Sequence, residues 1–190
     1  DKDSKVTDML YACYDSAEAG RDFREELSAI RARYEEIVAG LEIDLNLDGE
    51  FEAIERNFQS KAGRDYAASR GEYLNGIIMA AYLEFEFVDA AEVILFDEGG
   101  AFDAEKTNRM LAERLKACKY AVIPGFYGAK PGGEIRTFSR GGSDITGSIV
   151  AKAVQADVYE TWTDVSGFLV ADPRIFHTPK GIAVITYREL

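Results

Sequence analysis

Residues 134–154 have the sequence EIRTFSRGGSDITGSIVAKAV, and the pattern of apolar positions changes in the middle of this stretch. Apolar and polar side chains alternate over Glu134–Ser139, which predicts a β-strand. Apolar residues recur at helical spacing from about Ile145 to Val154, and the paired glycines Gly141 and Gly142 separate the two patterns. A strand that turns through glycines into a helix is typical of α/β proteins.

The sequence on either side repeats this alternation of short strands and helices. A helix is predicted from about Ala104 to Lys116, with Asp103 as its N-cap. Further strands are predicted where short apolar runs occur, at Phe85–Val88, Glu92–Phe96, Tyr120–Phe126 and Val158–Thr163. Strands that alternate with helices favour a mainly parallel sheet with helices on both faces, so we expect the α/β fold class.

The first half of the chain is predicted to be helical. It contains no proline, since all four prolines lie after residue 120. Apolar side chains recur every three or four residues in the windows 6–17, 23–41, 47–58 and 74–81, which predicts four helices. The aromatic stripe in the second and third windows is interpreted as core. Ser69 and Glu72 have the spacing of a capping box at the predicted start of the fourth helix.

The composition is that of one globular unit with a sizeable core, because 47% of the 190 residues are hydrophobic and 29% are charged. Lys and Arg number 22 against 34 Asp and Glu, a net charge of −12, and no basic patch stands out. Such a surface repels nucleic acid and anionic lipid, so neither is an expected partner. Cys13 and Cys118 lie far apart, which predicts neither a disulfide framework nor a zinc site and favours a cytoplasmic setting.

No apolar run approaches the roughly 18 residues of a membrane span. The chain opens in a polar run directly before a helix and stops without a tail, so we expect it to be a piece of a longer protein.

The glycine turn before the second helix window has the chemistry of an anion site. Free backbone N–H groups at a helix start attract anions, and glycines let a ligand come close. Arg140 offers a bidentate grip on a carboxylate or phosphate, and Asp144 offers a partner for an amine. The alternative interpretation is a tight turn in which Ser143 or Asp144 is an N-cap.

A second group of polar residues follows the strand predicted at Val158–Thr163. Thr163 and Asp164 stand at the carboxyl end of that strand, where open α/β sheets bind ligands. Arg174, in the turn Asp172-Pro173-Arg174, is placed to reach a phosphate. The alternative is a surface loop with a solvated arginine.

Glu72 and Thr7 each allow two interpretations, a helix cap or a contact with a ligand, and for Glu72 that ligand group is an amine. His177 is the only histidine, which gives little support to a metal site or a Ser-His-Asp triad. Composition and spacing alone lead no further than an α/β domain with sites suited to a charged small molecule.

Six motifs nonetheless occur together in one order, and they cover nearly the whole chain. They are Lys5–Leu10, Ser69–Leu74, Pro124–Gly128, Phe138–Asp144, Trp162–Gly167 and Ala171–Arg174. In these motifs the chain resembles the catalytic domain of aspartokinases, within the amino acid kinase superfamily. The resemblance implies a three-layer α/β fold in which residues 1–190 are part of the catalytic domain. Residues from about 20 to 60 then form a variable helical insert, and residues 120–190 carry the nucleotide- and substrate-binding motifs.

The resemblance also implies an activity and its ligands. Aspartokinases use ATP and Mg²⁺ to phosphorylate the side-chain carboxylate of L-aspartate, the first step toward lysine, threonine and methionine. The metal is held largely through the ATP phosphates, so no protein metal site is expected. A homodimer is the implied assembly of the full-length protein.

Residue roles carry over motif by motif. The implied substrate-binding residues are Thr7, Glu72, Arg140, Gly141, Ser143 and Asp144, with Glu72 and Asp144 near the amine and Arg140 on a carboxylate. The implied nucleotide-binding residues are Thr163, Asp164, Leu169 and Arg174.

The chain also departs from the family pattern. The lysine of the family's Lys-Phe-Gly-Gly-Thr-Ser loop has no counterpart in these 190 residues, nor do the regulatory ACT domains. No catalytic residue is therefore assigned, and we expect residues 1–190 alone to have little or no kinase activity. Leu169 replaces a common tyrosine. The alternatives are another amino acid kinase, or a non-catalytic paralogue that binds aspartate or ATP.

Overall fold

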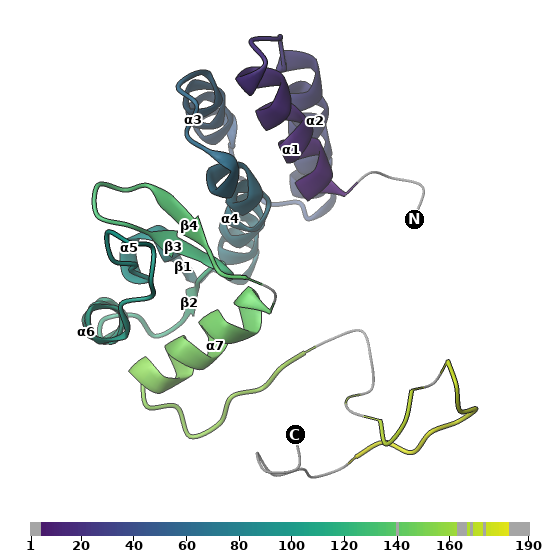
Figure 1. The fold of residues 1–190 in the computed structure, drawn as a ribbon, viewed down its shortest axis with the longest axis vertical. Coiled ribbons are helices and arrows are strands. Elements are labelled where there is room, and N and C mark those ends of the chain that lie inside the picture. Colours follow the sequence, from purple (N-terminus) through teal and green to yellow (C-terminus); the bar gives the residue numbers. More distant parts are fainter. Residues whose placement is uncertain (1–4, 140, 163–166, 168, 173, 183–190) are drawn as a thin grey trace. The chain divides into compact units, whose positions relative to one another are not determined.

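Four helices form the N-terminal half of the protein, as the apolar spacing predicts (Figure 1). The computed structural model describes residues 5–139, 141–162, 167, 169–172 and 174–182. Its first helices are α1 (Val6–Glu18), α2 (Arg24–Gly40), α3 (Asp48–Gln59) and α4 (Arg64–Leu83). Each turns an apolar stripe into one shared core, which includes Leu10, Cys13, Ile30, Tyr34, Phe51, Ile54, Phe58 and Leu74. The aromatic stripe of the second and third windows is buried there, and α2 and α3 fall within the 20–60 segment.

The capping box predicted at Ser69 and Glu72 is wrong, because both residues lie inside α4 and not at its start. Gly63, with φ of 97°, is the actual N-cap residue. The Ser69 hydroxyl donates to the carbonyl oxygen of Tyr66 at 2.8 Å, a bond typical of a helix interior. The helix begins earlier than predicted because its first turns are buried against the neighbouring helices.

The strands follow α4 and are short. β1 (Glu86–Phe87) pairs in parallel with β2 (Ala121–Val122), and β3 (Tyr127–Ala129) pairs antiparallel with β4 (Ile135–Thr137). A parallel bridge from Leu95 to Ala129 connects the segment after β1 to β3. The remaining helices are α5 (Ala90–Val93), α6 (Ala104–Leu115) and α7 (Gly142–Ala153).

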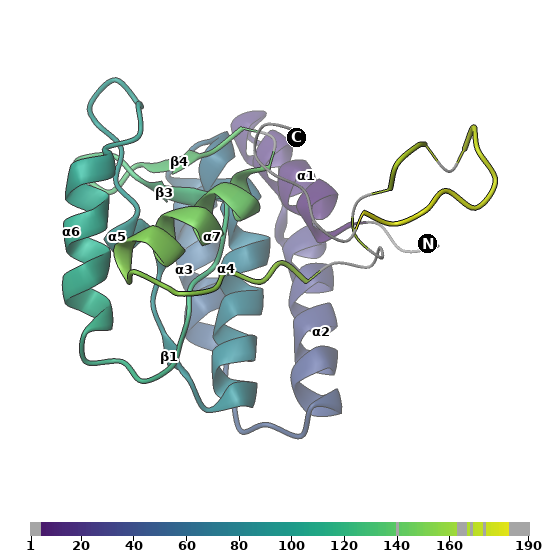
Figure 2. The same ribbon diagram turned by 90° about the horizontal axis from the view of Figure 1, so that it is seen from below.

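Helices cover the strands on both sides (Figure 2). On one side α4 contacts β1, β2 and β4. On the other side, α6 and α7 pack against each other and add Leu111, Ile149 and Val150 to a second apolar core around Val88, Ile94 and Tyr127. The α/β fold class is confirmed, with a parallel pair of strands and one antiparallel hairpin.

One predicted strand is formed only in part, another is not observed among the described residues, and one predicted helix cap is confirmed. In the predicted strand Glu92–Phe96, the first residues belong to the short helix α5, which Asp89 caps by accepting a hydrogen bond from the Ala91 amide at 3.0 Å. Its end is extended as predicted, because Leu95 forms a parallel bridge with Ala129. In the predicted strand Val158–Thr163, residues 158–162 have no ladder partner among the described residues, and Thr163 lies outside them. Asp103 caps α6 as predicted, with its carboxylate 3.0 Å from the Lys106 amide.

The chain divides into two units, residues 1–159 and 160–190, and each is described by itself. In the described part of the second unit, Leu169 and Gly181 form an antiparallel bridge, and the Val170 amide donates to the Lys180 carbonyl at 3.0 Å. None of the helices described for this chain combines the length and the apolar character that crossing a membrane requires.

Candidate functional site

Thr7 and Glu72 lie on different helices but line the same cavity. This cavity has a volume of about 220 Å³ and is lined by Val6, Thr7, Tyr34, Gly71, Glu72 and Asn75. The helices α1 and α4 pack against each other here, and Gly71 lies at their contact. A Cβ atom at that position would lie 3.6 Å from Val6 Cγ1 and 3.7 Å from Leu10 Cδ1. Two of the residues that the sequence singles out for substrate contact are thus brought together.

The Glu72 carboxylate is partly buried in this cavity. Burial raises the pKa of the Glu72 carboxyl above its ordinary value, because the charged form has lost part of its hydration. No described lysine or arginine forms an ion pair with Glu72. A desolvated carboxylate of this kind gains strongly from a cation that enters the cavity, so the site is suited to an ammonium group.

The two glycines at the start of α7, Gly141 and Gly142, are required for different structural reasons. Gly141 is the N-cap residue and adopts a φ of 79°, a left-handed conformation that glycine tolerates best. Gly142 is required by packing, since a Cβ atom there would lie 2.8 Å from Phe126 Cβ and 2.9 Å from Phe138 Cβ. Arg140, the predicted carboxylate ligand, lies outside the described residues.

Ser143 and Asp144 are neighbours in sequence but face different cavities. Ser143 lines a cavity of about 480 Å³ between α7 and the segment 121–125, together with Gly125 and Thr146. Asp144 lines a groove of about 400 Å³ between α6 and α7, with Asn108 and Lys152. Successive helix residues point about 100° apart, which separates the two side chains. The structure therefore places neither Ser143 nor Asp144 in the cavity of Thr7 and Glu72.

A chain of close contacts runs from α4 to the start of α7. Gly76 lies one helical turn after Glu72 on the same face of α4. Its missing side chain leaves room for Pro124, whose Cγ would be 3.3 Å from a Cβ atom at Gly76. The next residue, Gly125, touches Ser143, because a Cβ atom at Gly125 would lie 3.1 Å from the Ser143 Cα. The Pro124–Gly125 turn thus joins the helix of Glu72 to the N-terminus of α7.

Hydrogen bonds fix β4 to the same helix. The Asp65 carboxylate, in the first turn of α4, accepts from the Thr137 amide at 3.0 Å and pairs with the Arg136 guanidinium at 3.4 Å. β4 leads directly to the glycine turn, so Asp65 helps to set where α7 begins.

Two of the predicted nucleotide-binding residues lie in the described part of the second unit. Arg174 is 88% exposed, and its guanidinium is 2.7 Å from the Asp172 carboxylate. This ion pair and hydrogen bond hold the pKa of the Asp172 carboxyl below its ordinary value. Leu169 belongs to the bridge with Gly181. Thr163 and Asp164 lie outside the described residues.

Comparison with known proteins decides the family. Residues 6–190 match the amino acid kinase family. The chain belongs to this family. The crystal structure of Clostridium acetobutylicum aspartate kinase is similar over the whole chain, with a TM-score of 0.93 and 52% sequence identity, and the match covers 44% of that protein. Aspartokinase 3 of Bacillus subtilis is 32% identical over 203 residues, which cover all of this chain and 45% of the relative.

A more distant member is Escherichia coli aspartokinase III, crystallised with aspartate and ADP. It has a TM-score of 0.73 and 25% identity over 94% of this chain and 44% of its own length. The chain thus spans less than half the length of these relatives. Within the amino acid kinase family, the helices, the short strands and the glycine turn described above are therefore parts of one known fold.

Asn75 and Tyr34, two polar residues that line the cavity of Glu72, are not among the predicted site residues. Asn75 lies three positions after Glu72, so a helical projection places it on the same face of α4. Tyr34 belongs to the apolar stripe of α2 and was interpreted as core only. The structure confirms that Tyr34 is buried and adds that its side chain lines the cavity. No local pattern distinguishes such a residue from an ordinary core tyrosine.

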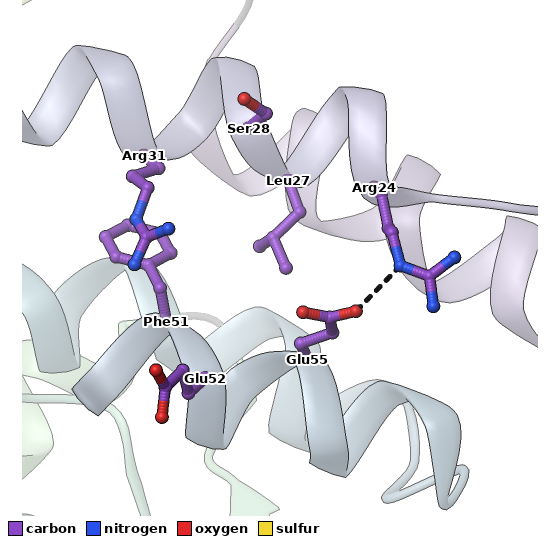
Figure 3. Close-up of a pocket in the computed structure, with 7 residues that line it drawn as sticks. All are labelled: Arg24, Leu27, Ser28, Arg31, Phe51, Glu52 and Glu55. Atoms are coloured by element: carbon purple, nitrogen blue, oxygen red, sulfur yellow. Dashed lines mark hydrogen bonds and ion pairs between the residues drawn. The ribbon is translucent and has the colours of Figure 1, made fainter. Parts of the chain in front are cut away.

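Another small cavity lies between α2 and α3 and has a volume of about 120 Å³ (Figure 3). Its charged groups already have partners within the protein. Arg24 Nε is 2.9 Å from the Glu55 carboxylate, and Arg31 pairs with Asp48 at 2.9 Å. Arg31 Nε itself makes no hydrogen bond but lies 3.6 Å from the Glu35 carboxylate. No predicted site residue lines this cavity, and we assign it no ligand.

Proposed function

We propose that the full-length protein is an aspartate kinase that transfers the γ-phosphoryl group of ATP to the side-chain carboxylate of L-aspartate. The observation that carries the proposal is the cavity shared by Thr7 and Glu72, with its desolvated carboxylate and without a cationic partner in the described structure. The similarity of the whole chain to aspartate kinases, one of them solved with aspartate and ADP, supports this choice of substrate.

Different residues bind different groups of the aspartate molecule. Glu72 binds the α-ammonium group, and the Thr7 hydroxyl contacts the same ligand from α1. The start of α7, with Gly141, Ser143 and the positive end of the helix dipole, favours a carboxylate, which Arg140 also attracts. Asp144 lines a separate groove, so we assign it a structural role in the first turn of α7 and no contact with the amine.

Phosphoryl transfer then needs alignment and charge stabilisation more than covalent chemistry. An oxygen of the aspartate side-chain carboxylate attacks the γ-phosphorus, the bond to the β-phosphate oxygen breaks, and ADP leaves. Thr163, Asp164, Leu169 and Arg174 are the proposed nucleotide contacts, with the Arg174 guanidinium directed at the phosphates. Among the described residues, no group of three or more histidine, cysteine, aspartate or glutamate side chains is placed to hold a metal ion. We propose that Mg²⁺ is bound by the phosphates of ATP.

Two further parts of the proposal concern the whole protein. We propose a homodimer as its assembly and the cytoplasm as its location, which the free thiols of Cys13 and Cys118 favour. The reaction would be the first step in the synthesis of lysine, threonine and methionine from aspartate.

A coupled ADP-release assay on the full-length protein tests the function. Aspartate, glutamate, N-acetylglutamate and a nucleoside monophosphate are compared as acceptors at saturating MgATP, with the Glu72→Gln variant as the control for the cavity. We expect the wild type to phosphorylate aspartate and none of the other three acceptors, and we expect Glu72→Gln to lose nearly all of this activity. Turnover with another acceptor would assign a different amino acid kinase. Calorimetric binding of aspartate or ATP with no turnover would assign a non-catalytic paralogue.

A further inference from the structure

Tyr34 connects the helical segment between residues 20 and 60 to the candidate substrate cavity. It lies in α2, which runs alongside α1 (Figure 2), and its side chain is only 5% exposed. Its ring packs against Phe51 of α3 at 6.3 Å between centroids. Its hydroxyl donates a hydrogen bond to the carbonyl oxygen of Gly71 in α4 at 3.0 Å. A residue of the variable segment thus reaches the backbone directly before Glu72.

The position of this hydrogen bond matters for the cavity. Inside a helix, the Gly71 carbonyl already accepts from the amide four residues later, at Asn75. The Tyr34 hydroxyl adds a second donor from outside the helix, and so it ties the turn that carries Glu72 and Asn75 to α2. Gly71 lies directly beside the Tyr34 side chain, since a Cβ atom at Gly71 would be in ordinary van der Waals contact with the Tyr34 hydroxyl, at 3.9 Å.

The surroundings of Tyr34 keep it a hydrogen-bond donor. Burial, and to a lesser extent the charge of Glu72, raises the pKa of the Tyr34 hydroxyl to about 12. The hydroxyl is therefore protonated throughout the physiological pH range. The ring itself lines the cavity beside Thr7 and Glu72, so Tyr34 also sets the shape of the space that a ligand enters.

We propose that Tyr34 is a positioning residue for the amino acid substrate, which holds the Gly71–Glu72 turn of α4 in place and lines the cavity of Glu72. This inference rests on the proposed function, since it assigns the amino acid to that cavity. It gives the segment between residues 20 and 60 a direct part in substrate binding, although no sequence motif marks it.

The test compares Tyr34→Phe with Tyr66→Phe in the full-length protein. Both variants lose a buried tyrosine hydroxyl from the same apolar core, but Tyr66 does not line the cavity. Because the Gly71 carbonyl keeps its bond within the helix, Tyr34→Phe is expected to fold. We expect its KM for aspartate to rise about tenfold, with kcat and the KM for ATP within about twofold of the wild type. Tyr66→Phe should leave all three constants within about twofold.

A second measurement needs no substrate. Amide hydrogen exchange in the segment 71–76 of α4 is compared between the two ligand-free variants. We expect exchange there to be about tenfold faster in Tyr34→Phe than in Tyr66→Phe. The proposed role of Tyr34 would be overturned if Tyr34→Phe and Tyr66→Phe exchanged these amides at the same rate, or if the two variants had the same KM for aspartate. A wild-type protein that does not turn over aspartate would instead contradict the proposed function, while the exchange measurement still decides whether Tyr34 anchors α4.

Discussion

The side-chain oxygen of Thr146, in the second turn of α7, accepts a hydrogen bond from the backbone amide of Phe126 at 3.0 Å. The same hydroxyl donates to the Gly142 carbonyl at 3.0 Å. Phe126 has a φ of 66°, a left-handed conformation that is rare for an aromatic residue. Thr146 therefore holds a strained turn against the start of the helix that carries the glycine motif.

Replacing Thr146 by valine should destabilise the protein by about 1–3 kcal/mol, because the Phe126 amide then loses its acceptor in a partly buried place. Thr146→Ser keeps the hydroxyl and should cost about 1 kcal/mol or less. Urea unfolding of the two variants and the wild type measures the difference. If valine and serine are equally tolerated, the hydrogen bond does not hold the turn.

Gly142→Ala should destabilise the protein by about 1–3 kcal/mol, because the new methyl group must push Phe126 or Phe138 aside. It should also lower kcat/KM for aspartate about tenfold or more, since α7 begins at this contact. The matched control is Gly132→Ala, which introduces a methyl group into open space on the β3–β4 hairpin at a φ of 88°. That variant should lose about 1 kcal/mol through backbone strain and keep its activity. Similar activity in the two variants would argue against a role for the α7 start.

Glu72→Gln separates function from stability. The pKa of Glu72 is raised by burial, so the folded protein holds this proton more tightly than the unfolded chain does. As the pH rises from the unfolded-state pKa through the folded-state pKa, ionisation of Glu72 therefore lowers the free energy of unfolding. Glutamine stays neutral, so at pH 8 the variant should be at least as stable as the wild type, and this advantage should disappear as the pH falls below the unfolded-state pKa.

The same variant should lose about 100-fold or more in kcat/KM for aspartate, because a neutral amide replaces the carboxylate that faces the ammonium group. Thermal melts between pH 4 and 8 and steady-state kinetics measure the two effects. A variant that loses stability in proportion to its activity would mean that Glu72 is a structural residue.

Arg70 is expected to be a residue of stability, although it belongs to the same motif as Glu72. It is 5% exposed and its guanidinium carbon lies 4.2 Å from the ring centroid of Tyr73 and 4.5 Å from that of Tyr66. Two of its nitrogens also donate to the Ser69 hydroxyl, at 3.1 and 2.9 Å. Lysine has no planar group to stack and donate in this way. Arg70→Lys should therefore lower the free energy of unfolding by about 2–3 kcal/mol.

The control for Arg70 is Arg64→Lys. Arg64 also lies over an aromatic ring, 4.0 Å from the centroid of Tyr11, but its side chain is 57% exposed. This substitution should change the free energy of unfolding by no more than about 0.5 kcal/mol. Equal losses in the two variants would show that burial of the guanidinium is not what matters at Arg70.

The sequence predicts the helices of this protein better than its strands. Apolar spacing is a local property, and it locates α1 to α4, α6 and α7, with Asp103 as the cap of α6, because each helix buries one stripe. The strand predicted at Glu92–Phe96 forms only at its end, around Leu95, because the capping side chain of Asp89 starts a short helix at Ala90. The capping box at Ser69 failed because tertiary burial extends α4 upstream of the polar signal.

The site is predicted less completely, and the reasons are geometric. The motifs identify Thr7 and Glu72, which the structure brings into one cavity, although they are 65 positions apart in the sequence. The same motifs treat Ser143 and Asp144 alike, whereas the helix turns their side chains toward different cavities. Tyr34 is recognised only in three dimensions, because its role depends on the contact between α2 and α4.

Arg174 offers the sharpest test of the nucleotide-binding assignment. Its side chain is 88% exposed, so Arg174→Ala should change the free energy of unfolding by no more than about 0.5 kcal/mol. If the guanidinium meets the ATP phosphates, the same variant should raise the KM for ATP about tenfold and leave the KM for aspartate unchanged. Arg174→Lys should recover part of the loss, because lysine supplies the charge without the planar fork.

Salt provides an internal control for Arg174. Raising the ionic strength from 0.1 to 0.5 M screens an exposed charge, so the difference in ATP KM between the wild type and Arg174→Ala should shrink. An unchanged ATP KM in Arg174→Ala at low salt would favour the other interpretation of this turn, a surface loop in which the arginine pairs only with Asp172.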